Sequence, residues 1–113
     1  MSNMQFNGGG NTIVVPAVNT DKGYVLWALL RYGPQTVEEL QALTDIRGIS
    51  PRVYDLNNPI PIVYTTTEQK TRRRGTLVKT VDIVRYHVNF NLVDLRQPIW
   101  NDFLQNGDAH YLS

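Results

Sequence analysis

Five basic side chains lie within ten consecutive positions of this chain, and their type and spacing suggest a chemistry directly. They are Lys70, Arg72, Arg73, Arg74 and Lys79, and segment 70–79 contains no acidic residue. The chain has 11 basic and 10 acidic residues, so the 103 residues outside this segment carry six basic and ten acidic ones. The formal charge of +1 therefore combines +5 on the segment with −4 on the remainder. Concentrated positive charge predicts contact with nucleic-acid phosphates, whereas an isolated arginine run can also be a solvated tip or an exposed linker.

The chain offers few of the side chains that catalysis or metal binding requires. It has no Cys, which excludes a disulfide scaffold, a thiolate zinc site, an iron–sulfur cluster and a cysteine nucleophile. Its two imidazoles, His87 and His110, have no neighbouring metal ligands in the sequence. Ser50 has no adjacent His, and the glycines at 8–10 lack the Lys-Ser/Thr of a phosphate-binding loop. We therefore expect no enzyme activity, no metal site and no cofactor.

Segment 1–12 is rich in Asn and Gly, which predicts a flexible N-terminal arm ahead of the ordered domain. It lacks the basic and apolar regions of a signal peptide, and no apolar run approaches the roughly 18 residues of a membrane span. A chain of 113 residues has ordinary single-domain size. We expect a domain over 13–92, a C-terminal extension over 93–113, and a cytoplasmic location in keeping with the lack of Cys.

Two adjacent helices are predicted after the arm. The first spans 21–32, with Thr20 as its N-cap and Gly33-Pro34 as its end, and it is apolar nearly all round, so it belongs to the core. The second begins at Thr36, which is expected to form a capping box with Glu39. Its predicted buried stripe consists of Val37, Leu40 and Leu43.

A short third helix is predicted after a loop over 44–49, in which Gly48 is the expected positive-φ residue. Ser50 is predicted as the N-cap, Pro51 as the first helical residue and Asn57-Asn58-Pro59 as the end. The side chains expected to face the core are Ile49, Val53 and Leu56. The solvent face would then offer Ser50, Arg52 and Asp55, with Tyr54 shared between the core and the surface.

The sequence changes to a period of two after the third helix. Alternating β-branched and aromatic residues predict one strand over 60–67 and a second over 77–90. Four of the five basic residues, Lys70, Arg72, Arg73 and Arg74, would occupy a long loop over 68–76 between them, and Lys79 would follow on the second strand. The expected topology is therefore a hairpin with a basic tip. The apolar side chains change parity between Ile83 and Val84, and a β-bulge at that point would bring them onto one face.

Three helices followed by a hairpin with a basic tip predict an α+β fold of the winged helix-turn-helix type. In such a fold the third helix enters the DNA major groove, and the hairpin, or wing, touches the backbone or the minor groove. Ser50 suits a phosphate, while Arg52 suits a guanine edge, a phosphate, or an ion pair with Asp55 at i+3. The predicted DNA-binding residues are Ser50, Arg52, Tyr54, Lys70, Arg72, Arg73, Arg74 and Lys79.

The segment Arg52-Val53-Tyr54-Asp55-Leu56, followed by Pro61-Ile62 and later by Arg85-Tyr86, resembles the small winged helix-turn-helix domains of bacteriophages and prophages. The resemblance covers about residues 20–90. It implies duplex-DNA binding in gene regulation or genome maintenance, and hence the cytoplasm of a bacterial host cell. Asn57-Asn58-Pro59 departs from the family pattern, in which the third helix usually continues with basic residues and a Gly turn.

The C-terminal extension leaves two partners open. Residues 98–104 predict a short amphipathic helix that is too small to stand alone. It could pack on its own domain, or on a second subunit in a homodimer, through Ile99, Trp100, Phe103 and Leu104. This aromatic segment and the charge-poor third helix also support an alternative function, a protein–protein interaction module that inhibits a bacterial host factor or defence system.

Overall fold

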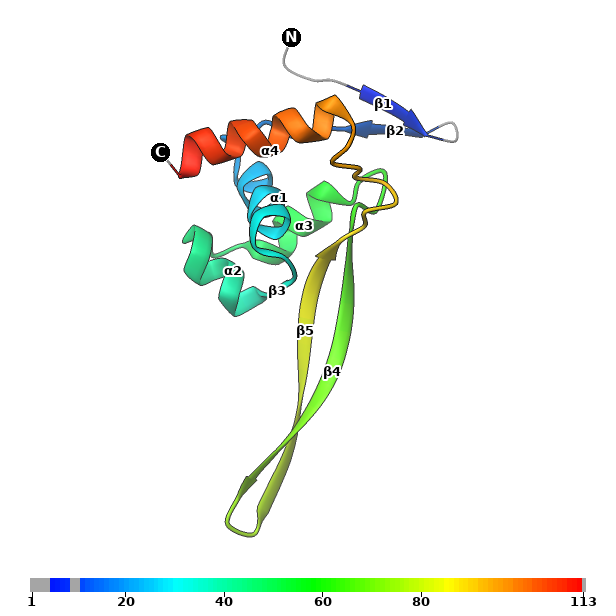
Figure 1. Cartoon of the computed structure of the whole chain (residues 1–113). Coiled ribbons are helices and arrows are strands. Elements are labelled where there is room, and N and C mark those ends of the chain that lie inside the picture. Colours follow the sequence, from blue (N-terminus) through cyan, green and yellow to red (C-terminus); the bar gives the residue numbers. More distant parts are fainter. Residues whose placement is uncertain (1–4, 9–10, 113) are drawn as a thin grey trace.

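Four helices and a three-stranded antiparallel sheet, with a separate N-terminal hairpin, form an α+β fold in the computed structural model, which describes residues 5–8 and 11–112 (Figure 1). The helices are α1 (Asp21–Tyr32), α2 (Val37–Thr44), α3 (Ile49–Leu56) and α4 (Pro98–Tyr111). The strands are β1 (Gln5–Gly8), β2 (Asn11–Val14), β3 (Gln35–Thr36), β4 (Val63–Arg74) and β5 (Leu77–Val88).

Helix α1 is the centre of the core, and its predicted bounds are confirmed. The hydroxyl of Thr20 accepts a hydrogen bond from the Gly23 N–H at 3.1 Å, which caps the helix, and Gly33 ends it with φ +83°. Gly23 is buried in the first turn of the helix. A Cβ at this position would lie 2.0 Å from the Ala17 carbonyl oxygen, so the entering chain requires glycine there.

Helix α2 has the predicted capping box. The Thr36 hydroxyl accepts from the Glu39 N–H at 3.1 Å, and the Thr36 N–H donates to Glu39 Oε1 at 2.9 Å. Leu40 is fully buried, but Leu43 is 40% exposed, so its predicted place in the buried stripe is wrong. Thr44 is buried instead, because its hydroxyl donates to the Leu40 carbonyl oxygen at 2.7 Å within the helix and needs no water.

Helix α3 begins two residues earlier than predicted, at Ile49 instead of Pro51. Gly48, with φ −92°, occupies the N-cap position, and the positive-φ residue of this turn is Asp45, with φ 58°, at the end of α2. Ser50 therefore lies inside the first turn and is not the N-cap. Pro51 is still tolerated, because the first N–H groups of a helix have no partner within it. The predicted inward residues are confirmed as buried, and they are Ile49, Val53 and Leu56.

The sheet has the strand order β3-β5-β4, and β4 and β5 pair without interruption from Val63–Val88 to Arg74–Leu77. The predicted long loop over 68–76 is wrong, since only a two-residue turn joins the strands, with Gly75 at φ +63°. The predicted bulge is wrong as well. Ile83 and Val84 stay on opposite faces of an uninterrupted ladder, where Ile83 is half-buried with Val81 and Arg85 while Val84 is exposed with Asp82.

Helix α4 is twice as long as the predicted segment, with 14 residues, and it packs on its own chain. Trp100 is fully buried and Phe103 nearly so. Gly107 contacts the Trp27 ring so closely that a Cβ there would lie 2.1 Å from Trp27 Cδ1. Trp27 Nε1 also donates to Asp108 Oδ1 at 2.9 Å. The aromatic side chains that suggested a subunit contact are thus part of the chain's own core.

The segment predicted as an N-terminal arm contributes the hairpin β1–β2, paired from Gln5–Val14 to Gly8–Asn11. The other residues of the predicted arm, 1–4 and 9–10, lie outside the described residues. Among the helices of residues 11–112, none is both long and apolar enough to cross a membrane.

Candidate nucleic-acid interface

The β4–β5 hairpin projects from the helices as a long twisted ribbon (Figure 1). Its base belongs to the core, where Val63, Tyr86 and Val88 are buried, whereas every residue of β4 beyond Val63 is exposed. Strands of 12 residues are about 40 Å long at 3.3–3.4 Å per residue. The hairpin therefore carries its distal end away from the helices, whereas the Arg72 side chain also lines a hollow with residues 36–39 at the N-terminus of α2.

Strand register divides the five predicted basic residues between two faces. Side chains alternate along β4, so Lys70, Arg72 and Arg74 share one face. Lys79 lies directly opposite Arg72 and joins that face, whereas Arg73 points to the other one. We call the set Lys70, Arg72, Arg74 and Lys79 the cationic face.

No acidic partner neutralises the basic cluster. Within the described residues, none of the five side chains has a carboxylate at ion-pair distance. Like charges directly opposite each other across a ladder destabilise a sheet, so the pair Arg72 and Lys79 costs folding free energy. An exposed cluster of unpaired basic side chains that lowers folding stability is expected where an anionic ligand neutralises the charge.

The base of the hairpin is built differently, because its one basic residue is fully paired. Arg85 donates from Nη1 to Glu39 Oε1 at 3.1 Å and from Nε to Glu68 Oε1 at 3.2 Å. Hydrogen bonding to the backbone N–H of Thr36, assisted by Arg85, holds the pKa of Glu39 below its usual range. These contacts attach the hairpin to the N-terminus of α2. No local pattern in the sequence predicts this role of Arg85, although the capping box predicts the position of Glu39.

Two apolar residues stand at the distal end of the hairpin. Leu77 is 73% exposed and Val78 is 58% exposed. Leu77 pairs with Arg74 on the cationic face, and Val78 pairs with Arg73 on the opposite face. We refer to Arg73, Arg74, Leu77 and Val78, with the turn at 75–76, as the tip.

The predicted residues of α3 lie apart from the basic cluster and carry little free charge. Arg52 does not pair with Asp55 as predicted. Its Nη2 lies 3.4 Å from Asp21 Oδ2, because the side chain crosses to the N-terminus of α1, where Asp21 occupies the first turn. The Ser50 hydroxyl lies 3.3 Å from the Tyr86 hydroxyl. Tyr54, at 71% exposed, is the large side chain that α3 presents to solvent.

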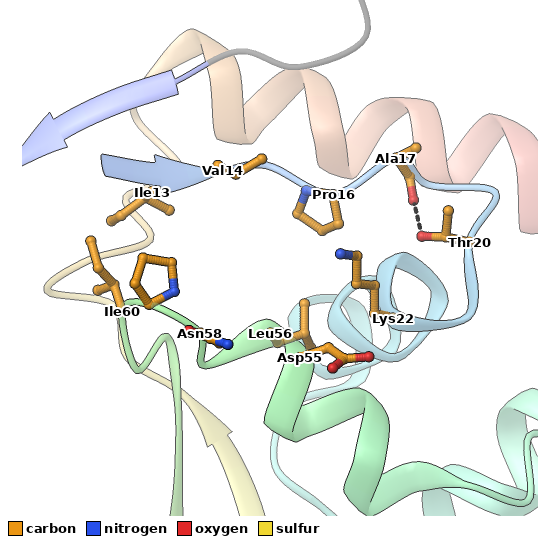
Figure 2. Close-up of a pocket in the computed structure, with 11 residues that line it drawn as sticks. Ile13, Val14, Pro16, Ala17, Thr20, Lys22, Asp55, Leu56, Asn58 and Ile60 are labelled. Carbon is orange, nitrogen blue, oxygen red and sulfur yellow. Dashed lines mark hydrogen bonds between the residues drawn. The ribbon is translucent and has the colours of Figure 1, made fainter. Parts of the chain in front are cut away.

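A groove beside the C-terminal end of α3 is a second candidate site (Figure 2). It measures about 280 Å³ and lies between β2, the N-terminus of α1 and the C-terminal end of α3. Ile13, Pro16 and Ile60 supply apolar walls, and Lys22 and Asp55 stand at its polar side. Sequence reasoning missed it because its walls come from segments far apart in the chain. Its volume is below the roughly 300–1,000 Å³ of typical small-molecule sites.

Both histidines pack against aromatic side chains. His87 stacks on Tyr64 with ring centroids 4.9 Å apart, and its Nε2 lies 2.7 Å from the Thr66 hydroxyl. His110 packs edge-on against Tyr111 at the end of α4. In the part of the chain that the structure describes, no three His, Cys, Asp or Glu side chains gather as metal ligands would.

Comparisons of the chain with protein-family models, curated proteins and solved structures find no match.

Proposed function

We propose that this protein binds double-stranded DNA as a winged helix-turn-helix, in the manner of a small phage or prophage regulator, with the β4–β5 hairpin as the wing. The observation that carries the proposal is the cationic face, whose four basic side chains have no acidic partner on the described part of the molecule. The element order α1, α2, α3 and then β4–β5 supports the same assignment.

The dimensions of the two elements suit one duplex. An α-helix such as α3 is about 10–12 Å across with its side chains, and the DNA major groove is about 12 Å wide. The hairpin, about 40 Å long, is long enough to follow the duplex over about one helical turn of 34 Å. With α3 in the major groove, the basic cluster would meet phosphates or the neighbouring minor groove.

In this proposal the hairpin supplies most of the affinity for DNA, and α3 sets the orientation of the protein on the duplex. The ion pair between Arg52 and Asp21 is partly exposed, and such pairs contribute only about 0.2–1 kcal/mol, so Arg52 can exchange Asp21 for a phosphate or a guanine edge at small cost. Ser50 and the exposed Tyr54 stand on the same helix and would contact the backbone or base edges. The five hairpin cations supply the sequence-independent attraction.

The salt dependence of binding tests this proposal. Five phosphate contacts predict a log–log slope of affinity against salt of about −4.5, since each contact contributes about −0.9. The triple variant Arg72→Ala, Arg73→Ala, Arg74→Ala should bind more weakly, with a slope of about −1.8. Equal affinity and slope in the variant and the wild type would exclude the wing from DNA binding.

A second candidate, a protein-binding module that acts on a bacterial host factor, is favoured by one observation on α3. Its single basic residue is engaged by Asp21, while Tyr54 is 71% exposed, and exposed aromatic residues are enriched at protein interfaces. Pull-down from nuclease-treated bacterial lysate separates the two functions. One stoichiometric protein partner that Tyr54→Ala fails to retain, with no DNA binding at physiological salt, would support this candidate and contradict the first.

A further inference from the structure

The tip combines exposed aliphatic side chains with basic side chains. Leu77 and Val78 are the first residues after the turn and are largely exposed, and each lies directly opposite an arginine. Exposed aliphatic side chains contribute nothing to the core. Aliphatic side chains beside arginines at the end of the hairpin are therefore expected to serve a ligand that offers both an apolar interior and a charged exterior.

We propose that Leu77, supported by Val78, is an apolar wedge that enters a base step from the minor groove, so that the protein kinks the DNA it binds. This inference rests on the proposed DNA-binding function and adds a deformation of the duplex to it. Aliphatic side chains inserted between base pairs unstack them and bend the duplex toward the major groove by about 20–90°. Base pairs supply the apolar interior, and phosphates supply the charged exterior.

The width of the hairpin requires such a deformation for entry into the minor groove. Paired strands lie about 4.8 Å apart before their side chains are counted, whereas the minor groove of B-DNA is only about 6 Å wide. A kink toward the major groove opens the minor groove at the same place. A hairpin that enters the minor groove therefore needs a wedge near its leading end, and Leu77 and Val78 directly follow the turn at 75–76.

The surrounding cations are placed to hold the opened groove. On the face of Leu77, Arg74 lies opposite it, and the next pair toward the base on that face is Arg72 with Lys79. Arg73 lies opposite Val78 on the other face. As the wedge enters between base pairs, basic side chains on both faces of the ribbon would reach the two phosphate walls, and arginine suits a minor groove with enhanced negative potential.

An anionic membrane also offers an apolar interior behind a charged surface, but the tip favours DNA. Stable membrane attachment takes a large buried apolar area, as a long acyl chain or an amphipathic helix provides, and two aliphatic side chains supply little. The tip also presents its cations on both faces of a ribbon, which matches two flanking phosphate walls better than one flat surface.

Bending and unstacking are measured on a duplex of about 30 base pairs with a fluorescence-transfer pair at its ends and 2-aminopurine at a flexible pyrimidine–purine step. The wild type should shorten the end-to-end distance and raise 2-aminopurine fluorescence. The double variant Leu77→Thr, Val78→Thr keeps residues that suit strands and all five cations. It should retain the salt slope but lose both signals. Val84→Thr, a similar change at an exposed valine nearer the base of the hairpin, should retain them.

The outcomes separate this inference from the proposed function. Binding by the wild type without bending, or equal bending by the double variant, would overturn the wedge and leave DNA binding in place. No binding to any duplex would overturn both. Binding to vesicles that contain anionic phosphatidylserine, in the absence of DNA bending, would assign the tip to a membrane and overturn the wedge.

Discussion

Lys79 lies directly opposite Arg72 across the β4–β5 ladder, with no acidic side chain of the described residues at ion-pair distance from either. Like charges at directly opposed positions destabilise a strand pair by about 0.2–1 kcal/mol. The same two residues belong to the cationic face, which we assign to phosphate contacts. The positive charge of these two residues thus lowers the stability of the distal hairpin while it favours DNA binding.

Lys79→Glu should stabilise the hairpin and weaken DNA binding, because it replaces a repulsive pair by an attractive one and removes a phosphate contact. Amide hydrogen exchange at Arg72 and its neighbours should slow, reflecting a local gain of about 0.2–1 kcal/mol. The salt slope should become shallower by about 0.9 or more. Lys79→Gln is the control, since it relieves the repulsion without adding an attraction and should give intermediate exchange. Faster exchange in Lys79→Glu would show that the Arg72–Lys79 pair is not repulsive.

Gly107→Ala should destabilise the protein, because the added methyl group would lie 2.1 Å from Trp27 Cδ1 at the contact between α4 and α1. Overpacking of this kind costs about 1–3 kcal/mol, measured as the free energy of unfolding in urea. Asn106→Ala, at an exposed position on the same helix, should change it by no more than about 0.5 kcal/mol. Equal stability of Gly107→Ala and the wild type would mean that α4 does not pack closely on its own chain.

Glu39→Gln should lower stability at neutral pH but not in acid. The pKa of Glu39 is held below its usual range by the Thr36 N–H and by Arg85, so the folded state favours the carboxylate. Its stabilisation is present above the unfolded pKa of about 4.3 and is lost as the pH falls through the lower folded value. We expect a deficit of about 0.5–1 kcal/mol at pH 7, as for exposed capping and ionic contacts, which disappears near pH 3.

The neighbouring variant Glu38→Gln provides the control for that measurement. Glu38 lies in the same first turn of α2 but is not part of the capping box. Thermal unfolding of both variants across pH 3–7 separates the Glu39 contacts from the general preference for acidic residues near a helix N-terminus. A Glu39→Gln deficit that is independent of pH, or equal to that of Glu38→Gln, would contradict the assigned role of the Thr36–Glu39–Arg85 contacts.

The local signals in the sequence predicted the helical part of the fold well. The bounds of α1 and the capping box of Thr36 and Glu39 depend on residues within one helical turn of each other, and both predictions are confirmed. The start of α3 was misplaced because Ser50 and Pro51 favour several positions within a first turn, and local sequence does not choose among them.

The hairpin was harder to predict because its distal part is exposed on both faces. Alternation of apolar and polar residues marks a strand that has one buried face. Residues 64–80 have no buried face, so the sequence of a segment such as Lys70–Arg74 is typical of a loop. The partners of Arg52 and Arg85 depend on contacts between elements far apart in the chain, and no spacing within α3 or β5 indicates Asp21 or Glu39. Residues of the predicted site were therefore easier to identify by type than to place by geometry.

The central claim is that DNA affinity comes from the position of the hairpin cations and not from net charge. It is tested most directly by comparing the salt dependence of duplex binding for two variants of equal charge. Arg72→Ala, Arg74→Ala removes half of the cationic face, whereas Arg31→Ala, Arg96→Ala removes two body arginines that make ion pairs with Asp108 and Asp94. The slope should be shallower by about 1.8 for the hairpin variant and unchanged for the body variant. Equal slopes in the two variants would contradict it.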